Sequence, residues 1–442
     1  MNDGIELIEE KRLEKLKAKY SKQSVLIVSS NKTIRNTLKR AFATLGFQMT
    51  NISVAEDYSE AKKTISEFAP HVVISNLYLS DGKSAIDLQK HHREYFPNSL
   101  NNLFMVLTEI DEHYVESLEH EYELDGLFLG QFNFKEYVEN FAEVLERKMV
   151  TSKADILEAK VKEALAKKDA QAAFTFLTAA TEAGLEDYRR KSLEADAHYL
   201  NNDHKSALKL YEEVLTEDSC NFHALINTIT INYSDKNYGV AHDYCEKFLS
   251  HFSSPPRHLP VILKIFLFNK EYFRIIKLCK EYDHDDRLEV SVKLNIAAAL
   301  ALCGKSLLAD QKDFAVEAFE RAISVSGGQS FNILQMVVTS LVSDPDLIEK
   351  SIAILEKYRD NFSDVNQFVA LEFDVLTSKR SAQENLSEGM MLIKKNVKSY
   401  RIYETLISSS LETGRRKEAI EDLVFEACRE FPDYSTQFKR YI

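Results

Sequence analysis

The sequence predicts a multidomain protein, in which an α/β domain is followed by an all-helical repeat domain. Between Val25 and Met149, short apolar segments alternate with amphipathic segments of helical period, which is typical of a parallel sheet with helices on both faces. From residue 154 to residue 442 no strand pattern follows, and a short apolar motif recurs instead. We therefore place the domain boundaries at 1–22, 23–150 and 151–442.

Length and composition limit the classes of function. With 442 residues the chain exceeds a single hydrophobic core, and its net charge of −13 argues against nucleic acid as a partner, because phosphate contacts need clustered Lys and Arg. The 5 cysteines form no CxxC pair, which predicts free thiols in a reducing compartment. We find no secretory signal and no window of about 18 uncharged apolar residues, so we expect a cytoplasmic protein without a membrane span.

Residues 1–22 have the pattern of a charged helix. Leu13, Leu16 and Tyr20 recur on one side of it. This spacing predicts a helix that packs on the following domain. A short coiled-coil helix that forms a homodimer is the alternative, since three heptads are the minimum for that interpretation.

Five strands and five helices alternate in the segment that follows. The expected strands are Val25–Val28, Gln48–Val54, His71–Ser75, Phe104–Thr108 and Gly126–Leu129. The expected helices are Asn31–Leu45, Tyr58–Phe68, Ser84–Tyr95, Asp111–Glu121 and Phe134–Lys148. In open parallel sheets the working site lies at the carboxyl ends of the strands. The residues at those ends are Ser29, Ser30, Asn76, Thr108 and Gln131.

Four stretches of this segment resemble the receiver domain of two-component response regulators. They are VLIVSSNKTIRNTLKRAF, PHVVISNLYLSDGKSAIDL, FMVLTE and LDGLFLGQF. The resemblance covers about 125 residues and implies a flavodoxin-like (β/α)5 fold, a bacterial origin and a role in signalling.

The sequence departs from that family at the residues that carry the chemistry. Family receivers hold Mg²⁺ with an acidic pair, accept phosphate on an aspartate and complete the site with a lysine. At the matching positions this chain has Ser29 and Ser30, Asn76, and Gln131, while Thr108 is retained and Phe128 matches the aromatic switch residue. Mg²⁺ prefers carboxylate oxygens, and an amide is no phosphate acceptor. We expect a pseudo-receiver that is independent of phosphorylation and has no metal, no cofactor and no catalytic residue.

The repeat motif of the second half has a period near 34 residues. Ala207, Tyr211 and Val214 give one copy, and Ala241 lies 34 positions after Ala207. Ile275 follows 34 positions after Ala241. This period resembles tetratricopeptide (TPR) repeats, in which helix pairs stack into a superhelical solenoid. We expect about eight helix pairs.

In that family the first helices of the pairs line a concave groove that binds peptides or helices. The resemblance therefore implies partner-binding candidates at matching positions of this chain. They are Arg189, Asp196, Tyr199, His223, Thr230, Tyr233, Arg257, Lys264, Arg401, Glu404 and Ser408.

Two functions follow from these observations. The first is a non-catalytic signalling adaptor or scaffold that binds protein partners, such as signalling, motility or localisation components, through the groove and the pseudo-receiver. The alternative is an output protein of the response-regulator type, controlled by a partner or a small ligand bound to the receiver-like domain. An enzyme is not expected, since no HExxH, P-loop or GxSxG element occurs. Homodimerisation through the receiver-like domain or the N-terminal helix stays open.

Overall fold

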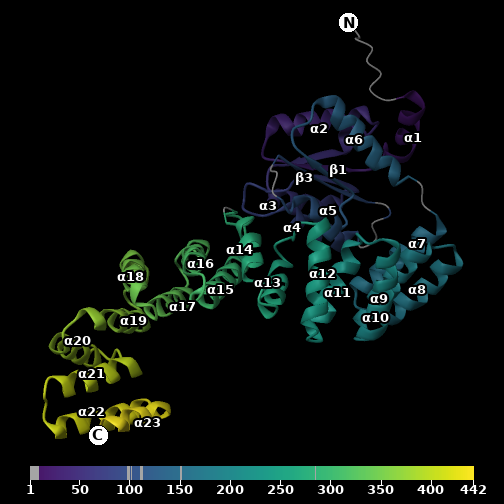
Figure 1. Cartoon of the computed structure of the whole chain (residues 1–442). Coiled ribbons are helices and arrows are strands. Elements are labelled where there is room, and N and C mark those ends of the chain that lie inside the picture. The colour runs from purple at the N-terminus through teal and green to yellow at the C-terminus, as the bar shows by residue number, and fades with distance from the viewer. Residues whose placement is uncertain (1–8, 97–99, 101, 110–112, 150–151, 284) are drawn as a thin grey trace. The chain divides into compact units, whose positions relative to one another are not determined.

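The computed structural model describes residues 9–96, 100, 102–109, 113–149, 152–283 and 285–442 (Figure 1). The chain divides into two compact units, residues 1–265 and 266–442. The first unit contains a parallel sheet and the first helical pairs, and the second contains helices.

Five parallel strands form the sheet of the first unit in the order β2-β1-β3-β4-β5. The strands are β1 (Val25–Val28), β2 (Ile52–Ala55), β3 (Val72–Asn76), β4 (Leu103–Thr108) and β5 (Gly126–Leu129). Val25 pairs with Ile52 on one side and Val72 on the other, so the strand order reverses at β1. This order is the doubly wound arrangement that flavodoxin-like sheets have. It is compatible with the predicted receiver-like domain.

Helices cover both faces of this sheet, as Figure 1 shows. On one face lie α2 (Lys32–Thr44) and α6 (Phe134–Arg147), whose Phe42 and Phe141 rings stack with centroids 5.1 Å apart above the strands. On the other lie α3 (Tyr58–Phe68), α4 (Ala85–Tyr95) and α5 (Val115–Tyr122). The N-caps Asn31, Asp57, Ser84 and Asn133 accept backbone hydrogen bonds from the first turns of α2, α3, α4 and α6, which explains where these helices begin.

Helix α1 (Glu10–Tyr20) packs on the same core as α2 and α6. Leu16 and Tyr20 are buried, and the Tyr20 hydroxyl donates to the Leu145 carbonyl over 2.8 Å. Arg12 forms a two-pronged ion pair with Glu146 on α6, with N–O distances of 2.8 Å. The apolar side of α1 is therefore used within the chain.

The sequence located these elements well and their ends less well. The predicted strand Gln48–Val54 begins only at Ile52, because Met49–Asn51 closes into a 3₁₀ turn. The predicted helix Asp111–Glu121 is α5, which begins at Val115, and Asp111 lies outside the described residues.

After the sheet the described chain is helical. The helices are α7 (Lys153–Ala166), α8 (Ala170–Glu182), α9 (Asp187–Leu200), α10 (His204–Glu217), α11 (Phe222–Ser234), α12 (Tyr238–His251), α13 (Leu259–Phe268), α14 (Tyr272–Lys280), α15 (Val290–Leu307), α16 (Lys312–Val325), α17 (Phe331–Val342), α18 (Ile348–Phe362), α19 (Asn366–Leu376), α20 (Ala382–Lys394), α21 (Tyr400–Glu412), α22 (Lys417–Glu430) and α23 (Ser435–Phe438). Within each unit, successive helices pack as TPR-like pairs (Figure 1).

The backbone of the turns inside these pairs repeats with the predicted period. Lys168, Asn202, Lys236 and Lys270 have left-handed φ angles of 59°, 59°, 63° and 61°, and each lies 34 positions after the one before. Few residues other than glycine adopt this conformation, so its recurrence marks one turn used four times. The first of these turns, at Lys168, lies 34 positions before the turn that precedes Ala207, so the repeats begin one pair earlier than the first predicted copy.

Helix α15 bears on the expectation that no segment of the chain spans a membrane. Among the described residues it alone is long and apolar enough to cross one, with a mean hydropathy of 1.4 over its 18 residues. Half of it is buried, and it packs against α14, α16 and α17. A buried core helix satisfies the same criterion, so length and composition do not make α15 a membrane span.

Candidate functional site

The predicted strand-end residues lie at the carboxyl edge of the sheet, as expected from its topology. Ser29 is buried directly after β1, and its Oγ accepts from the Asn31 backbone N–H over 3.2 Å. Ser30 is exposed, and Thr108 at the end of β4 is buried. Asn76 ends β3, and its Oδ1 is buried without a donor from the described part of the chain.

Two details of this edge were not foreseen. Gln131 is exposed, and its Nε2 donates to Glu109 over 3.3 Å. The buried guanidinium of Arg35 donates to the Ser29 carbonyl over 2.5 Å and pairs with Glu56. A cation thus lies beside the end of β1, where this chain has serines in place of the acidic pair of family receivers. No group of three or more His, Cys, Asp or Glu among the described residues is placed to hold a metal ion.

Phe128 of β5 is buried in the core of the sheet. Its ring packs against Phe141 of α6 with centroids 5.2 Å apart, in the core beneath α2 and α6. In the β4–β5 register Leu107 is paired with Phe128 and Thr108 with Leu129. Side chains alternate along a strand, so Phe128 and Thr108 point to opposite faces. Phe128, which matches the aromatic switch position of the receiver family in sequence, is thus a core residue on the face opposite Thr108.

Three predicted groove residues converge in the first unit. Arg189 and Asp196 on α9 and His223 on α11 line one cavity of about 430 Å³, together with Glu158 and Lys162 of α7. Arg189 pairs with Asp155 at 3.1 Å and with Glu158. Lys162 lies 3.6 Å from Glu158. The first-helix face of these pairs is thus lined by alternating charges.

Asp196 anchors a hydrogen-bonded network at the back of this cavity. Its Oδ1 accepts from the Tyr211 hydroxyl over 2.6 Å and from Asn227 Nδ2 over 3.1 Å, and Asn227 also donates to the Tyr211 oxygen over 2.9 Å. Burial raises the pKa of Asp196, and the bond from Tyr211 opposes the shift in part. The network fixes the spacing between α9, α10 and α11.

The other predicted groove residues of this region have different surroundings. Tyr199 is partly buried and packs against the core formed around Ala195, Ala207 and Tyr211. Tyr233 is half-buried beside Tyr238, with ring centroids 5.9 Å apart, and Thr230 Oγ1 donates within α11 over 2.8 Å. Arg257 lies 3.7 Å from Glu121, whereas Lys264 is exposed on α13.

A longer groove lies in the second unit. Cavities of about 840 Å³ and about 710 Å³ share Gln335 and Thr339 of α17, so they join into one surface. The groove continues over α19 with Gln367 and Asp374 and reaches Arg401 of α21. Burial raises the pKa of Asp374, and the positive charge of Arg401 opposes this shift.

The remaining candidates, Glu404 and Ser408, lie on the same helix as Arg401. Glu404 pairs with Arg401 at 3.2 Å. Ser408 is half-buried and donates to the Thr405 carbonyl over 3.1 Å. Of the three predicted residues on α21, Arg401 lines this groove, beside Tyr400 of the same helix.

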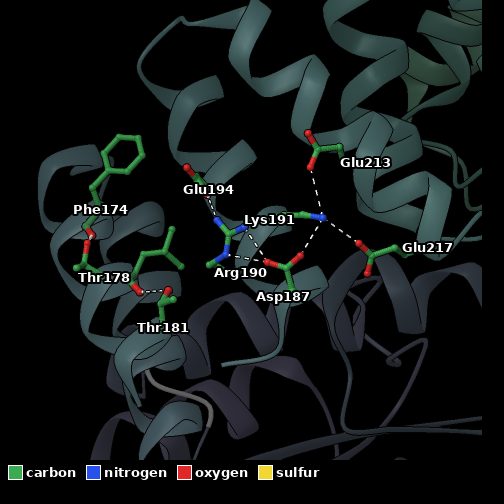
Figure 2. A network of polar contacts seen from close by, with 10 residues as sticks. Phe174, Thr178, Thr181, Asp187, Arg190, Lys191, Glu194, Glu213 and Glu217 are labelled. Carbon is green, nitrogen blue, oxygen red and sulfur yellow. Dashed lines mark hydrogen bonds and ion pairs between the residues drawn. The ribbon is translucent and has the colours of Figure 1, made fainter. Parts of the chain in front are cut away.

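A second charged network lies between α9 and α10, and Figure 2 shows it from close by. Lys191 Nζ lies 2.9 Å from Asp187, 2.9 Å from Glu217 and 3.4 Å from Glu213. Arg190 pairs with Asp187 at 2.8 Å and with Glu194. Hydrogen bonds to the three carboxylates raise the pKa of Lys191. Lys191 thus ties α9 to Glu213 and Glu217 of α10. Arg190 pairs within α9, and together with Glu194 it lines a cavity of about 360 Å³ beside α8.

The sequence contained a signal for two of the residues that it missed. Asp155 and Lys162 precede Arg189 and Asp196 by 34 positions each, so the same period identifies them as first-helix residues of an earlier pair. Gln335 and Thr339 had no such signal, because the period is interrupted near Gly304–Gln311.

No family model and no curated protein matches the sequence. Among solved structures, one of Naa15/Naa10 bound to HypK-THB is similar, with 14% identity, a TM-score of 0.48 and 66% of this chain covered. This chain spans only 44% of the length of that one. YrrB, described as a TPR protein with an unusual peptide-binding site, is similar over 44% of this chain and 96% of its own, with 16% identity and a TM-score of 0.32.

The RcsB response regulator of Salmonella typhimurium is similar over 45% of this chain and 98% of its own. The identity is 14% and the TM-score 0.24. Every TM-score here is below 0.5, so the proposals below rest on the geometry of this chain.

Proposed function

We propose that this protein is a non-catalytic scaffold that binds partner proteins in the groove formed by the first helices of its helical pairs. The observation that carries this proposal is the joined groove over α17, α19 and α21. Its length across three successive first helices suits an extended peptide or a helix better than a small molecule.

The groove wall supports recognition of a peptide backbone. Asn332, Gln335 and Thr339 are exposed on one stripe of α17, and Gln367 continues it on α19. Amide side chains can donate and accept at once, which matches the alternating N–H and C=O groups of an extended chain. Arg401 and Asp374 at one end add charges that give a bound segment its direction.

A peptide library displayed against the full chain tests this proposal. Gln335→Arg places a long cation where the two cavities meet, and we expect it to weaken a selected peptide at least about tenfold. Gln383→Arg is the matched control, since Gln383 is exposed on α20 and outside the groove. Equal losses in the two variants, or none in either, would contradict a groove on the first helices.

We further propose that the α/β region is a receiver-like domain that works without phosphate and that the protein is bacterial and cytoplasmic. The strand order and the neutral residues Ser29, Ser30 and Asn76 support the first point. A role in a signalling pathway, with a signalling, motility or localisation component as partner, rests on the sequence resemblance alone.

A further inference from the structure

In the first unit, the end of α5 covers the first-helix face of the helical pairs. The Ser117 hydroxyl donates to the Ser253 carbonyl over 2.7 Å. The His120 ring lies against Phe222 of α11 and Phe252, with centroids 6.2 and 5.2 Å away. Helix α5 and its neighbour α4, which supplies Arg93 to the cavity described above, therefore close over residues predicted to bind a partner.

The covering segment is acidic, and its carboxylates meet cations of the mixed-charge face that it covers. Glu123, directly after α5, pairs with Lys162 of α7 at 2.7 Å. Burial alone would raise the pKa of Glu123, but the Lys162 ammonium outweighs it and lowers the pKa. Glu121 faces Arg257 at 3.7 Å and His258 at 3.4 Å. Two carboxylates thus occupy the positions that an acidic ligand would take.

This contact is incompletely satisfied. The side chain of Glu121 is 4% exposed, yet neither carboxylate oxygen meets a hydrogen-bond donor within the described ranges. His223 Nε2 in the neighbouring cavity is buried and also meets none there. Buried polar atoms left without partners cost free energy. Glu121 regains water when α5 leaves, and an occupant that bonds to His223 gains a contact that α5 does not make.

We propose that the segment from Ser117 to Glu123 is a built-in occupant of the face formed by α7, α9, α11 and the start of α13, and that an acidic segment of a partner protein displaces it. The proposal rests on the function proposed above and adds the chemical class and the regulation of a second binding surface. The partner carries carboxylates spaced to reach Lys162 and Arg257. Because only open molecules can bind the partner, the apparent affinity for the partner is lowered in proportion to the fraction of molecules that are open.

Charge reversal tests whether the closure exists. Glu123→Lys in the full chain opposes Lys162, and we expect faster amide hydrogen exchange in α5 and α11. Adding Lys162→Glu restores an attractive pair, and exchange should return to the slow level. Unchanged exchange in the single variant, or no recovery in the double variant, would overturn the closure.

A synthetic peptide of residues 113–125, HYVESLEHEYELD, tests the acidic occupant. We expect it to bind the Glu123→Lys chain about fivefold more tightly than the wild-type chain, because the variant leaves Lys162 and Arg257 in place. The control peptide carries Gln at positions 119, 121 and 123 and should bind neither. Equal binding of both peptides, or equal affinity of both chains, would overturn the proposal.

The outcome is separable from that of the Gln335→Arg experiment. Gln335 lies in the second unit, and the peptide selected there serves as an independent readout. If that readout behaves as expected while the acidic peptide fails, the scaffold function stands and the displacement by acidic segments falls.

Discussion

Arg189, Asp196 and His223 lie on two helices and line the same cavity, although they are 7 and 27 positions apart along the chain. Their convergence is a property of side-chain direction. A first helix presents one stripe to the groove, and residues 34 positions apart occupy equivalent places on successive first helices. The same principle separates Phe128 from Thr108, because a strand alternates its faces at every residue.

His92 gives a prediction for the pH dependence of stability. It is buried on α4, where its Nε2 donates to the Pro70 carbonyl over 2.7 Å, and burial lowers its pKa to about 4. Between pH 6.5 and 4 the unfolded chain binds a proton at this site and the folded chain does not. Stability therefore falls as the pH falls, by about 3 kcal/mol over that window.

Denaturant unfolding of the full chain at pH 7, 5.5 and 4.5 measures this loss of stability. Amide hydrogen exchange in α4 measures it locally. His92→Gln should flatten the dependence. His91→Gln is the matched control, because His91 is only partly buried and pairs with Glu94 at 2.9 Å. If His92→Gln left the change of stability with pH as it is in the wild-type chain, the pH dependence would have to come from other groups.

The strand-end residues predict the response to a phosphate donor. Incubation with acetyl phosphate and Mg²⁺ should add no mass to the protein, because Asn76 lacks a carboxylate nucleophile. Mass spectrometry of the intact chain checks this. A stoichiometric gain of one phosphoryl group, about 80 Da, on residues 23–150 would refute the chemistry argued from Ser29, Ser30 and Asn76.

At the scale of elements, the close approach of α15 and α16 depends on Gly304. A Cβ added there would lie 2.7 Å from the Phe319 ring and 3.0 Å from the Ala315 carbonyl oxygen. We expect Gly304→Ala to destabilise the second unit by about 1–3 kcal/mol, since overpacking outweighs the gain in helix propensity.

Gly239 on α12 is the matched control for this prediction. A Cβ at that position meets no atom within 4 Å. Gly239→Ala should therefore be neutral or stabilise by up to about 1 kcal/mol. Thermal unfolding of both variants decides the comparison, and equal effects would show that backbone entropy alone governs these sites.

At the scale of the whole molecule, the sheet and the first helical pairs belong to one compact unit, residues 1–265. The predicted boundary at residue 150 marks a change of secondary structure, but contacts such as that of Ser117 with Ser253 cross it. Stacked helical pairs depend mainly on their neighbours. Removing the sheet should therefore destabilise only the helical pairs that contact it.

A fragment of residues 152–442 tests this expectation. Amide exchange in α15 to α22 should match that of the full chain, because the second unit has its own core. Exchange in α11 and around residues 252–258 should be faster, since Phe222 and Phe252 lose the cover of His120. Identical protection throughout, or loss of structure in α15 to α22, would contradict the independence of the units.

The secondary-structure elements follow from patterns along the chain. Hydrophobic period located β1, α3 and β5 at their observed ends, and a 34-residue spacing identified the helical pairs, because both signals depend on neighbours along the chain. The sequence also indicated that the strand ends lack carboxylates at Ser29, Ser30 and Asn76.

The contacts between those elements became visible in the three-dimensional packing. The pairing of Glu123 with Lys162, the core position of Phe128 and the joining of two cavities at Gln335 and Thr339 all depend on side-chain direction across elements. A periodic pattern gives the face on which a residue lies and not the partner opposite it. That partner is set by packing between segments distant in the sequence, for which this single sequence carries no spacing signal.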